Sequence, residues 1–191
     1  MNQENRARLK LVAIVMLFVV PVAAAYILYF TMSGLAPSGE SNQGELLDPV
    51  QPLPSLQLTG RDGAVTSADV LAEKWTFLQV APEGCRDECR TSLDETLQIW
   101  RLLGDKKPRV QRVLLVGDGK RAPDPGRKPL SVYQGQLAAI WQLIEQHAAG
   151  RPGTVYLVDP HGNWVLFYPP EQDGTELYND TKHLLSLSYI G

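Results

Sequence analysis

The sequence predicts an α/β domain, with a central mixed sheet flanked by helices, attached to one N-terminal transmembrane helix. Three observations support this fold class. Leu11–Phe30 carries no charged residue and is long enough to cross a hydrocarbon core of about 30 Å. Trp75–Val80 and Val110–Val116 are almost entirely apolar, which is typical of strands covered on both faces of a sheet. The segment between these two strands has apolar residues at helical spacing, which predicts a helix that connects them.

The charges around the apolar run predict its orientation in a membrane. Arg6, Arg8 and Lys10 precede it, and the first charged residues after it are acidic. By the positive-inside rule, residues 1–10 lie in the cytoplasm and Leu11–Phe30 is the anchor. The rest of the chain is then expected in the periplasm of a bacterium, tethered to the inner membrane.

A cleaved signal peptide is the alternative interpretation of this segment. Such a peptide has a shorter apolar core, with a cleavage site of small residues just beyond it. Here the alanines Ala23–Ala25 lie inside the apolar run, and Tyr26–Phe30 continue it. This order favours a retained anchor.

The composition changes twice after the apolar run. Residues 31–54 are rich in Gly, Ser, Pro, Asn and Gln, which predicts a flexible linker. Residues 55–191 have the usual size of one domain with one core. The chain has 18 basic and 21 acidic residues, so it lacks the basic excess of a nucleic-acid-binding protein.

Periodicity and turn residues predict the elements of residues 55–191. The first part should form a hairpin over Ser55–Val65, a short helix over Thr66–Leu71 and a strand over Trp75–Val80. Next we expect a helix that contains Leu93–Leu103 and ends at Gly104, a strand over Val110–Val116 and a surface loop over Gly117–Pro129. The last part should contain a second helix with Tyr133, Leu137, Ile140, Trp141 and Ile144 on one face, two strands over Thr154–Val158 and Asn163–Tyr168 joined by a turn, and a last helix over Thr175–Ser188. A helix that joins the first two core strands requires a right-handed crossover and a parallel pair. The core order β-α-β-α-β-β-α is that of a thioredoxin-like fold.

The two cysteines of the chain, Cys85 and Cys89, follow the first core strand directly, where the next helix is expected to begin. A helix N-terminus offers free N–H groups and a positive dipole end, and both stabilise a thiolate. Because the chain has no other cysteine, a disulfide within it must join these two. Positions four residues apart on a helix lie within the Cα range that a disulfide can close. We therefore expect Cys85 and Cys89 to be a redox pair.

The cysteine segment and two flanking segments resemble the Sco family of copper-handling, thioredoxin-like proteins. Lys74–Val80 followed by Cys85–Cys89 resembles the family's strand and Cys-x-x-x-Cys loop, and Tyr156–Asn163 resembles its later hairpin. The resemblance extends over about Ser55 to Leu184. It implies a copper chaperone that assembles the dinuclear copper centre of cytochrome c oxidase. Its partners would be a respiratory oxidase subunit or assembly factors of that oxidase.

The chain departs from the Sco pattern at its metal ligands. Sco proteins usually have proline after each cysteine, where this chain has Arg86 and Arg90, and they carry a histidine ligand at the position of Arg151. Of the three histidines, His147 is the candidate third ligand, because the segment after it leads into the strand that passes the cysteine loop. Cu(I) is soft and two thiolates can hold it, so Cys85, Cys89 and His147 are the predicted metal ligands.

Three functions are compatible with these residues. The first is a Sco-like metallochaperone that delivers copper to an oxidase, or controls the thiol redox state in it, during assembly. The second is a periplasmic thiol–disulfide oxidoreductase, since the redox reaction needs only Cys85 and Cys89. The third is a non-catalytic domain with a structural disulfide, as found in oxidising compartments. Two cysteines and three dispersed histidines argue against a four-ligand structural zinc site.

Overall fold

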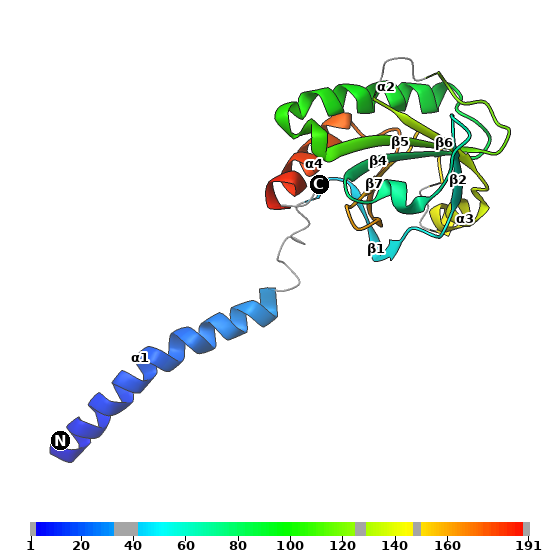
Figure 1. Ribbon diagram of the computed structural model, residues 1–191. Coiled ribbons are helices and arrows are strands. Elements are labelled where there is room, and N and C mark those ends of the chain that lie inside the picture. The colour runs from blue at the N-terminus through cyan, green and yellow to red at the C-terminus, as the bar shows by residue number, and fades with distance from the viewer. Residues whose placement is uncertain (1–2, 33–41, 125–128, 147–149, 189–191) are drawn as a thin grey trace. The chain divides into compact units, whose positions relative to one another are not determined.

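A computed structural model describes residues 3–32, 42–124, 129–146 and 150–188 of the chain (Figure 1). The chain divides into two compact units, residues 1–41 and 42–191.

The first unit is one long helix, α1 (Gln3–Met32). Within it, Lys10–Ile27 is long and apolar enough to cross a membrane, and no side chain of that segment is buried against protein. Pro21 lies inside the helix, a position that transmembrane helices tolerate. A helix that is apolar on all sides needs an apolar environment. The predicted apolar helix is therefore present, with the length and composition of a membrane span.

The second unit is built on one mixed sheet of eight strands. The strands are β1 (Glu45–Pro52), β2 (Gln57–Gly60), β3 (Val65–Ser67), β4 (Trp75–Ala81), β5 (Val110–Gly117), β6 (Ser131–Gly135), β7 (Val155–Val158) and β8 (Asn163–Tyr168). The helices are α2 (Asp87–Leu102), α3 (Ala138–Gln146) and α4 (Gly174–Leu187), with short 3-10 helices η1 (Ala68–Leu71) and η2 (Gly104–Arg109). Across the sheet the order is β1-β8-β7-β4-β5-β6-β2-β3.

The centre of the sheet agrees with the predicted crossover. β4 and β5 are parallel, with Trp75 opposite Val110 and Ala81 opposite Val116, and α2 connects them. β7 pairs antiparallel with the other side of β4, and β8 pairs antiparallel with β7. This arrangement is the predicted thioredoxin-like fold.

Alternation along the central strands supplies two separate cores, because successive side chains point to opposite faces. Leu78 and Val80 of β4 pack on one face with Ile140 and Ile144 of α3. Phe77 packs on the other face among side chains of α2 and α4. Figure 1 shows α2 and α3 on opposite faces of the sheet. Strands buried on both faces must be apolar throughout, which explains the continuous runs in the sequence.

Two segments differ from the sequence-based expectation. Glu45–Pro52, placed in the predicted linker of residues 31–54, forms edge strand β1, and Leu47 is buried in the core. Its prolines suggested a linker, but an edge strand tolerates proline because one side of its backbone needs no partner. Tyr133 was expected on the second helix. It lies instead in β6, which pairs parallel with β5, and α3 begins only at Ala138.

A buried carboxylate helps to attach the start of the second unit to the rest of the domain. Asp180 of α4 is 2 % exposed and accepts the backbone N–H of Gln43 and of Gly44, each at 2.8 Å, and the hydroxyl of Tyr168 at 2.9 Å. Burial, reinforced by the charge of Asp180, raises the pKa of Tyr168. The hydroxyl therefore keeps its proton and remains a donor to the carboxylate.

Candidate functional site

The two cysteines lie at the junction of β4 and α2 and form a disulfide. Their Cα atoms are 5.3 Å apart, and both side chains are buried among apolar residues of β5, β6 and α2. The helix begins at Asp87, two residues before the second cysteine, so Cys89 lies in its first turn. Arg86 occupies the N-cap position without a side-chain capping bond. The first-turn N–H groups are therefore free to stabilise a nearby thiolate.

Polar groups beneath α2 fix this helix to the sheet. Gln79 of β4 is buried and donates to the hydroxyl of Ser92 at 2.6 Å. Arg112 of β5 is also buried and donates to the Leu93 carbonyl and the Thr96 hydroxyl of α2. Burial lowers the pKa of Arg112 to about 10, so it is still charged at neutral pH. These contacts fix the position of α2, the helix that contains Cys89, relative to β4 and β5.

One side of the cysteine turn is covered by the chain segment that follows β5, residues 118–124, which we name the cover loop. The Cys85 N–H donates to the carbonyl of Arg121 at 3.1 Å. Gly84 has a φ of +93°, and a Cβ added there would lie 3.2 Å from the same carbonyl. The backbone at Gly84 and Cys85 is thus in direct contact with the cover loop.

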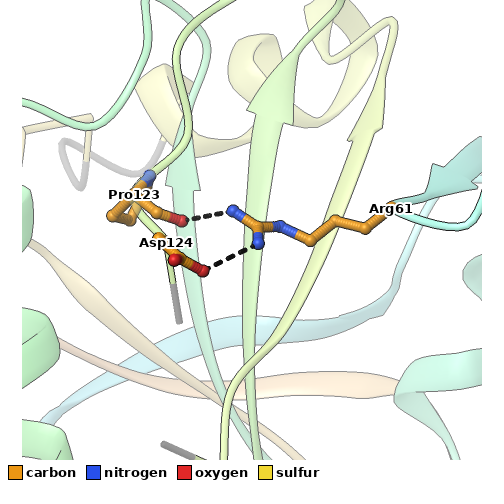
Figure 2. A network of polar contacts seen from close by, with 3 residues as sticks. All are labelled: Arg61, Pro123 and Asp124. Carbon is orange, nitrogen blue, oxygen red and sulfur yellow. Dashed lines mark hydrogen bonds and ion pairs between the residues drawn. The ribbon is translucent and has the colours of Figure 1, made fainter. Parts of the chain in front are cut away.

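Charged side chains also hold the cover loop. Arg61, in the turn between β2 and β3, bonds the carbonyl of Pro123 at 2.7 Å and the carboxylate of Asp124 at 3.1 Å (Figure 2). Lys120 forms an ion pair with Glu83 at 2.7 Å, and this contact lowers the pKa of Glu83. The loop therefore connects the β2–β3 hairpin with the cysteine turn.

The other side of the cysteine turn borders a cavity of about 410 Å³. Cys89 lines this cavity, together with the turn residues before it, Trp141 of α3, and Pro152 and Gly153 of the segment that precedes β7. Gly153 has a φ of +87°, and a Cβ there would lie 3.2 Å from the carbonyl of Glu88. A side chain at this position would therefore press on the first turn of α2.

Sequence reasoning found the two cysteines but not the cavity wall. Trp141 was assigned to the apolar face of a helix; it is half-buried and its indole N–H donates to Glu145 at 2.9 Å. Pro152 and Gly153 of the cavity wall precede the strand that was predicted over Thr154–Val158. No local pattern marks these residues, because they meet Cys89 only through the topology of the sheet.

The predicted metal ligands are only partly within the described residues. Cys85 and Cys89 are joined to each other, and His147 lies outside the described residues. Arg151, which the sequence resemblance matches to the Sco histidine, forms an ion pair with Glu171. Among the residues that the structure describes, no three His, Cys, Asp or Glu side chains gather as a metal site. Among the described residues, the sulfur atoms of Cys85 and Cys89 are the candidate ligands for a soft cation once the disulfide is reduced.

The fold and the cysteine pair define a thioredoxin-like domain with a dithiol–disulfide site at a helix N-terminus. This chain belongs to the family described as "transmembrane-like, thioredoxin-like, C-terminal domain", whose model matches residues 75–188, more than half of the chain. No curated protein matches the sequence.

Solved structures of Sco proteins share the fold. Apo Sco1 from Thermus thermophilus superposes with a TM-score of 0.59 at 20 % identity, over 77 % of this chain and 99 % of that chain. Copper-bound yeast Sco1 has a TM-score of 0.57 at 15 % identity, over 71 % and 92 %. BsSco has 0.54 at 14 % identity, over 75 % and 99 %. At these identities the likeness is one of fold, and at that level it confirms the resemblance predicted from the sequence.

Proposed function

We propose that this protein is a membrane-anchored thiol–disulfide protein that controls the redox state of cysteines in a respiratory oxidase during assembly. The observation that carries the proposal is the Cys85–Cys89 disulfide at the N-terminus of α2, beside a cavity. A bridge that closes so short a loop restricts the unfolded chain little, so stabilisation alone is a weak reason for it. A reversible dithiol at a helix N-terminus is a stronger one.

The apolar helix supports a proposal for where the protein is located. We propose that Leu11–Phe30 anchors the protein in a bacterial inner membrane, with residues 1–10 in the cytoplasm and the domain in the periplasm. The basic residues Arg6, Arg8 and Lys10 before the helix support this orientation. In an oxidising compartment, cysteines of an incoming protein form disulfides unless a dithiol reduces them. An anchor in the same membrane would keep the domain in the compartment where a membrane-bound oxidase is assembled.

The choice of an oxidase as the client rests on the shared fold. BsSco is a member of the Sco family of cytochrome c oxidase assembly proteins, and a disulfide switch has been identified in it. A copper centre with thiolate ligands requires reduced cysteines before the metal enters. Thiol control by this chain would prepare such a centre.

An exchange assay on the full-length protein in detergent tests the redox proposal. The reduced protein is mixed with glutathione disulfide, and release of glutathione is followed. We expect the wild type to become the Cys85–Cys89 disulfide and to release two glutathione molecules per chain. The matched control is the variant with both cysteines replaced by serine, which should release none. A wild type that behaves like this control would leave a structural disulfide as the function of the pair.

Delivery of Cu(I) is the second candidate function, and the copper-bound structure of yeast Sco1, which shares this fold, favours it. Here copper is the cargo, and the thiolates of Cys85 and Cys89 would hold it after reduction, because soft thiolates select Cu(I). The ion pair of Arg151 with Glu171 occupies the place of the family's histidine, so a third ligand would have to come from His147. We expect about one Cu(I) per reduced chain and weak binding of Cu(II).

Competition with a Cu(I) chelator tests this candidate independently of exchange. The reduced wild type should retain copper, and Cys85→Ser and Cys89→Ser should each lose it. His147→Ala should leave Cu(I) binding unchanged and weaken Cu(II) binding. Exchange activity without copper retention would leave thiol control as the sole function, and copper retention without exchange would favour the chaperone.

A further inference from the structure

We infer that Trp141 of α3 determines which client segments this protein accepts, and that it favours a segment with an aliphatic or aromatic side chain next to the reacting cysteine. The inference rests on the proposed exchange function and names the class of substrate for that site. It is based on the position of Trp141 in the wall of the cavity beside the disulfide and on the chemistry of that wall.

The cavity beside the disulfide is lined by both helical layers of the domain. Cys89 in the first turn of α2 and Trp141 of α3 line it together, at the carboxyl end of β4. These two helices lie on opposite faces of the sheet, as Figure 1 shows. The volume of about 410 Å³ lies within the range of about 300–1,000 Å³ that is usual for ligand pockets. A client cysteine that reacts with this pair would therefore bring its neighbouring residues to the cavity.

Trp141 offers this cavity hydrocarbon surface. The side chain is half-buried and packs in part against the core on the α3 face of the sheet. Its indole N–H, the one polar group of the side chain, donates to Glu145 on the same helix at 2.9 Å. Because this N–H is already bonded, a client meets the aromatic ring and not a free donor. Covering such a ring with an apolar side chain removes apolar surface from water, which is favourable.

The charged residues of the wall give a client no comparable selection. Glu83, Arg86 and Glu88 line the cavity, and all three are exposed to solvent. Glu83 is already paired with Lys120 at 2.7 Å. Arg86 and Glu88 have opposite charges, so together they do not favour one sign of charge in a client. Pro152, which also lines the cavity, is exposed and adds a further apolar surface. The wall therefore selects by apolar contact.

The reaction is that of the proposed function, and Trp141 takes no part in the transfer of electrons. The client S–S bond breaks, the Cys85–Cys89 bond forms, and both client sulfurs leave as thiols with the two protons of the dithiol. The client gains two electrons and the protein loses two; a dithiol reductant of the same compartment returns the protein to its reduced form. Trp141 contacts the client beside the exchanging sulfurs, so it should act mainly on KM.

Two peptide substrates test the inference on the reduced, full-length protein in detergent. Each is a hexapeptide with one cysteine, joined to a second copy by a disulfide. The two differ only in the residues on either side of the cysteine, which are leucine in one and serine in the other. Release of peptide thiol gives kcat and KM. We expect kcat/KM to be at least about tenfold higher for the leucine peptide, because burial of most of a leucine side chain gives a factor of this size.

Variants of the tryptophan provide the second measurement. Trp141→Ala should reduce the preference to less than about threefold, mainly by raising KM for the leucine peptide. Trp141→Phe keeps an aromatic ring and should retain most of the preference. Leu102→Ala, which removes an exposed apolar side chain at the C-terminal end of α2, is the matched control and should keep the preference. The ratio between the two peptides does not depend on the amount of active protein, so partial unfolding of a variant cannot imitate the expected result.

The outcomes separate the inference from the proposed function. A wild type that reduces both peptides equally well, or the serine peptide faster, would overturn the inference and keep the exchange reaction. So would a preference that Trp141→Ala leaves intact, because another part of the wall would then select the client. A wild type that reacts with glutathione disulfide and with neither peptide would also overturn the inference alone. A wild type that reacts with none of the three disulfides would overturn the proposed function.

Discussion

The two sides of the cysteine turn are built differently. On the Cys85 side, the cover loop lies against the backbone of the turn and is held by Arg61 and by the Lys120–Glu83 pair. On the Cys89 side, Trp141, Pro152 and Gly153 line a cavity together with Cys89. One disulfide therefore has a covered half and an open half.

This difference shows how a buried disulfide can still react. Both cysteines are almost fully buried, at 6 % and 5 % exposure, so exposure does not distinguish them. The two cysteines differ in what lies next to them. The cover loop is hydrogen-bonded to the backbone of Cys85, and a cavity lies beside Cys89. The ties of the loop are solvent-exposed ion pairs, which are individually weak. The covered half is thus closed by individually weak contacts, and the other half borders a cavity.

The largest expected effect comes from removing either sulfur. Cys85→Ser and Cys89→Ser should each reduce turnover of a disulfide substrate by at least about 100-fold, since residues that act as one unit fail together. Each variant keeps one thiol, which has no partner in the chain to resolve a mixed disulfide. Steady-state rates with mass spectrometry of the trapped protein measure the effect. Undiminished turnover in either variant would show that the two sulfurs do not act as a pair.

A remote substitution should change stability and leave the two sides unchanged. Asp180→Ala leaves the N–H groups of Gln43 and Gly44 and the hydroxyl of Tyr168 without their acceptor, so it should lower the free energy of unfolding by about 2–4 kcal/mol. Tyr168→Phe removes one donor of the three and should cost about 1 kcal/mol. Chemical denaturation followed by tryptophan fluorescence measures both. A loss of thiol–disulfide exchange in the folded Asp180→Ala variant would show that the cysteine site is not locally determined.

A substitution beneath α2 should have an intermediate effect. Ser92→Ala leaves the buried amide of Gln79 without its partner at 2.6 Å, which should cost about 1–3 kcal/mol. Adding Gln79→Leu removes the unpaired group and should recover part of that loss. The double-mutant cycle, measured by denaturation, isolates the contribution of the pair. Additive losses would mean that this bond does not fix the helix that carries Cys89.

The smallest effect concerns the exposed tie of the cover loop. The hydrogen bond and charge of Lys120 lower the pKa of Glu83, so the contact favours the folded state above the ordinary glutamate pKa and is lost as the pH falls through the lowered value. Lys120→Met should return the pKa of Glu83 toward its ordinary value, with little change in stability at neutral pH. NMR titration of the Glu83 carboxyl measures the shift. An unchanged pKa in Lys120→Met would mean that this pair does not hold the loop.

The central fold and the cysteine pair could be predicted because their signals are local. Trp75–Val80 and Val110–Val116 are apolar throughout, as buried parallel strands must be, and Cys85 and Cys89 follow the first of them directly. The order of elements then requires the parallel crossover. These features depend on neighbouring residues in the chain.

The parts that were missed depend on distant contacts. β1 contains two prolines, so its sequence alone predicts a linker. It forms a strand because it pairs with β8, which is distant in the chain. Ser131–Gly135 has apolar residues that fit a helix as well as a strand, and the free edge of β5 decides in favour of the strand. The cavity joins Cys89 to Trp141 and Pro152, which come from other elements far along the chain. The spacing of residues in the sequence does not predict that these side chains line the same cavity.

The central claim is that the Cys85–Cys89 pair is a working dithiol, and a redox titration tests it most directly. The full-length protein in detergent is equilibrated with mixtures of reduced and oxidised glutathione, and its free thiols are counted by mass spectrometry after alkylation. We predict a reversible two-electron transition within the range of these mixtures, at a potential above about −300 mV. A disulfide that stays intact in every mixture, with a potential below about −300 mV as structural disulfides have, would contradict the account.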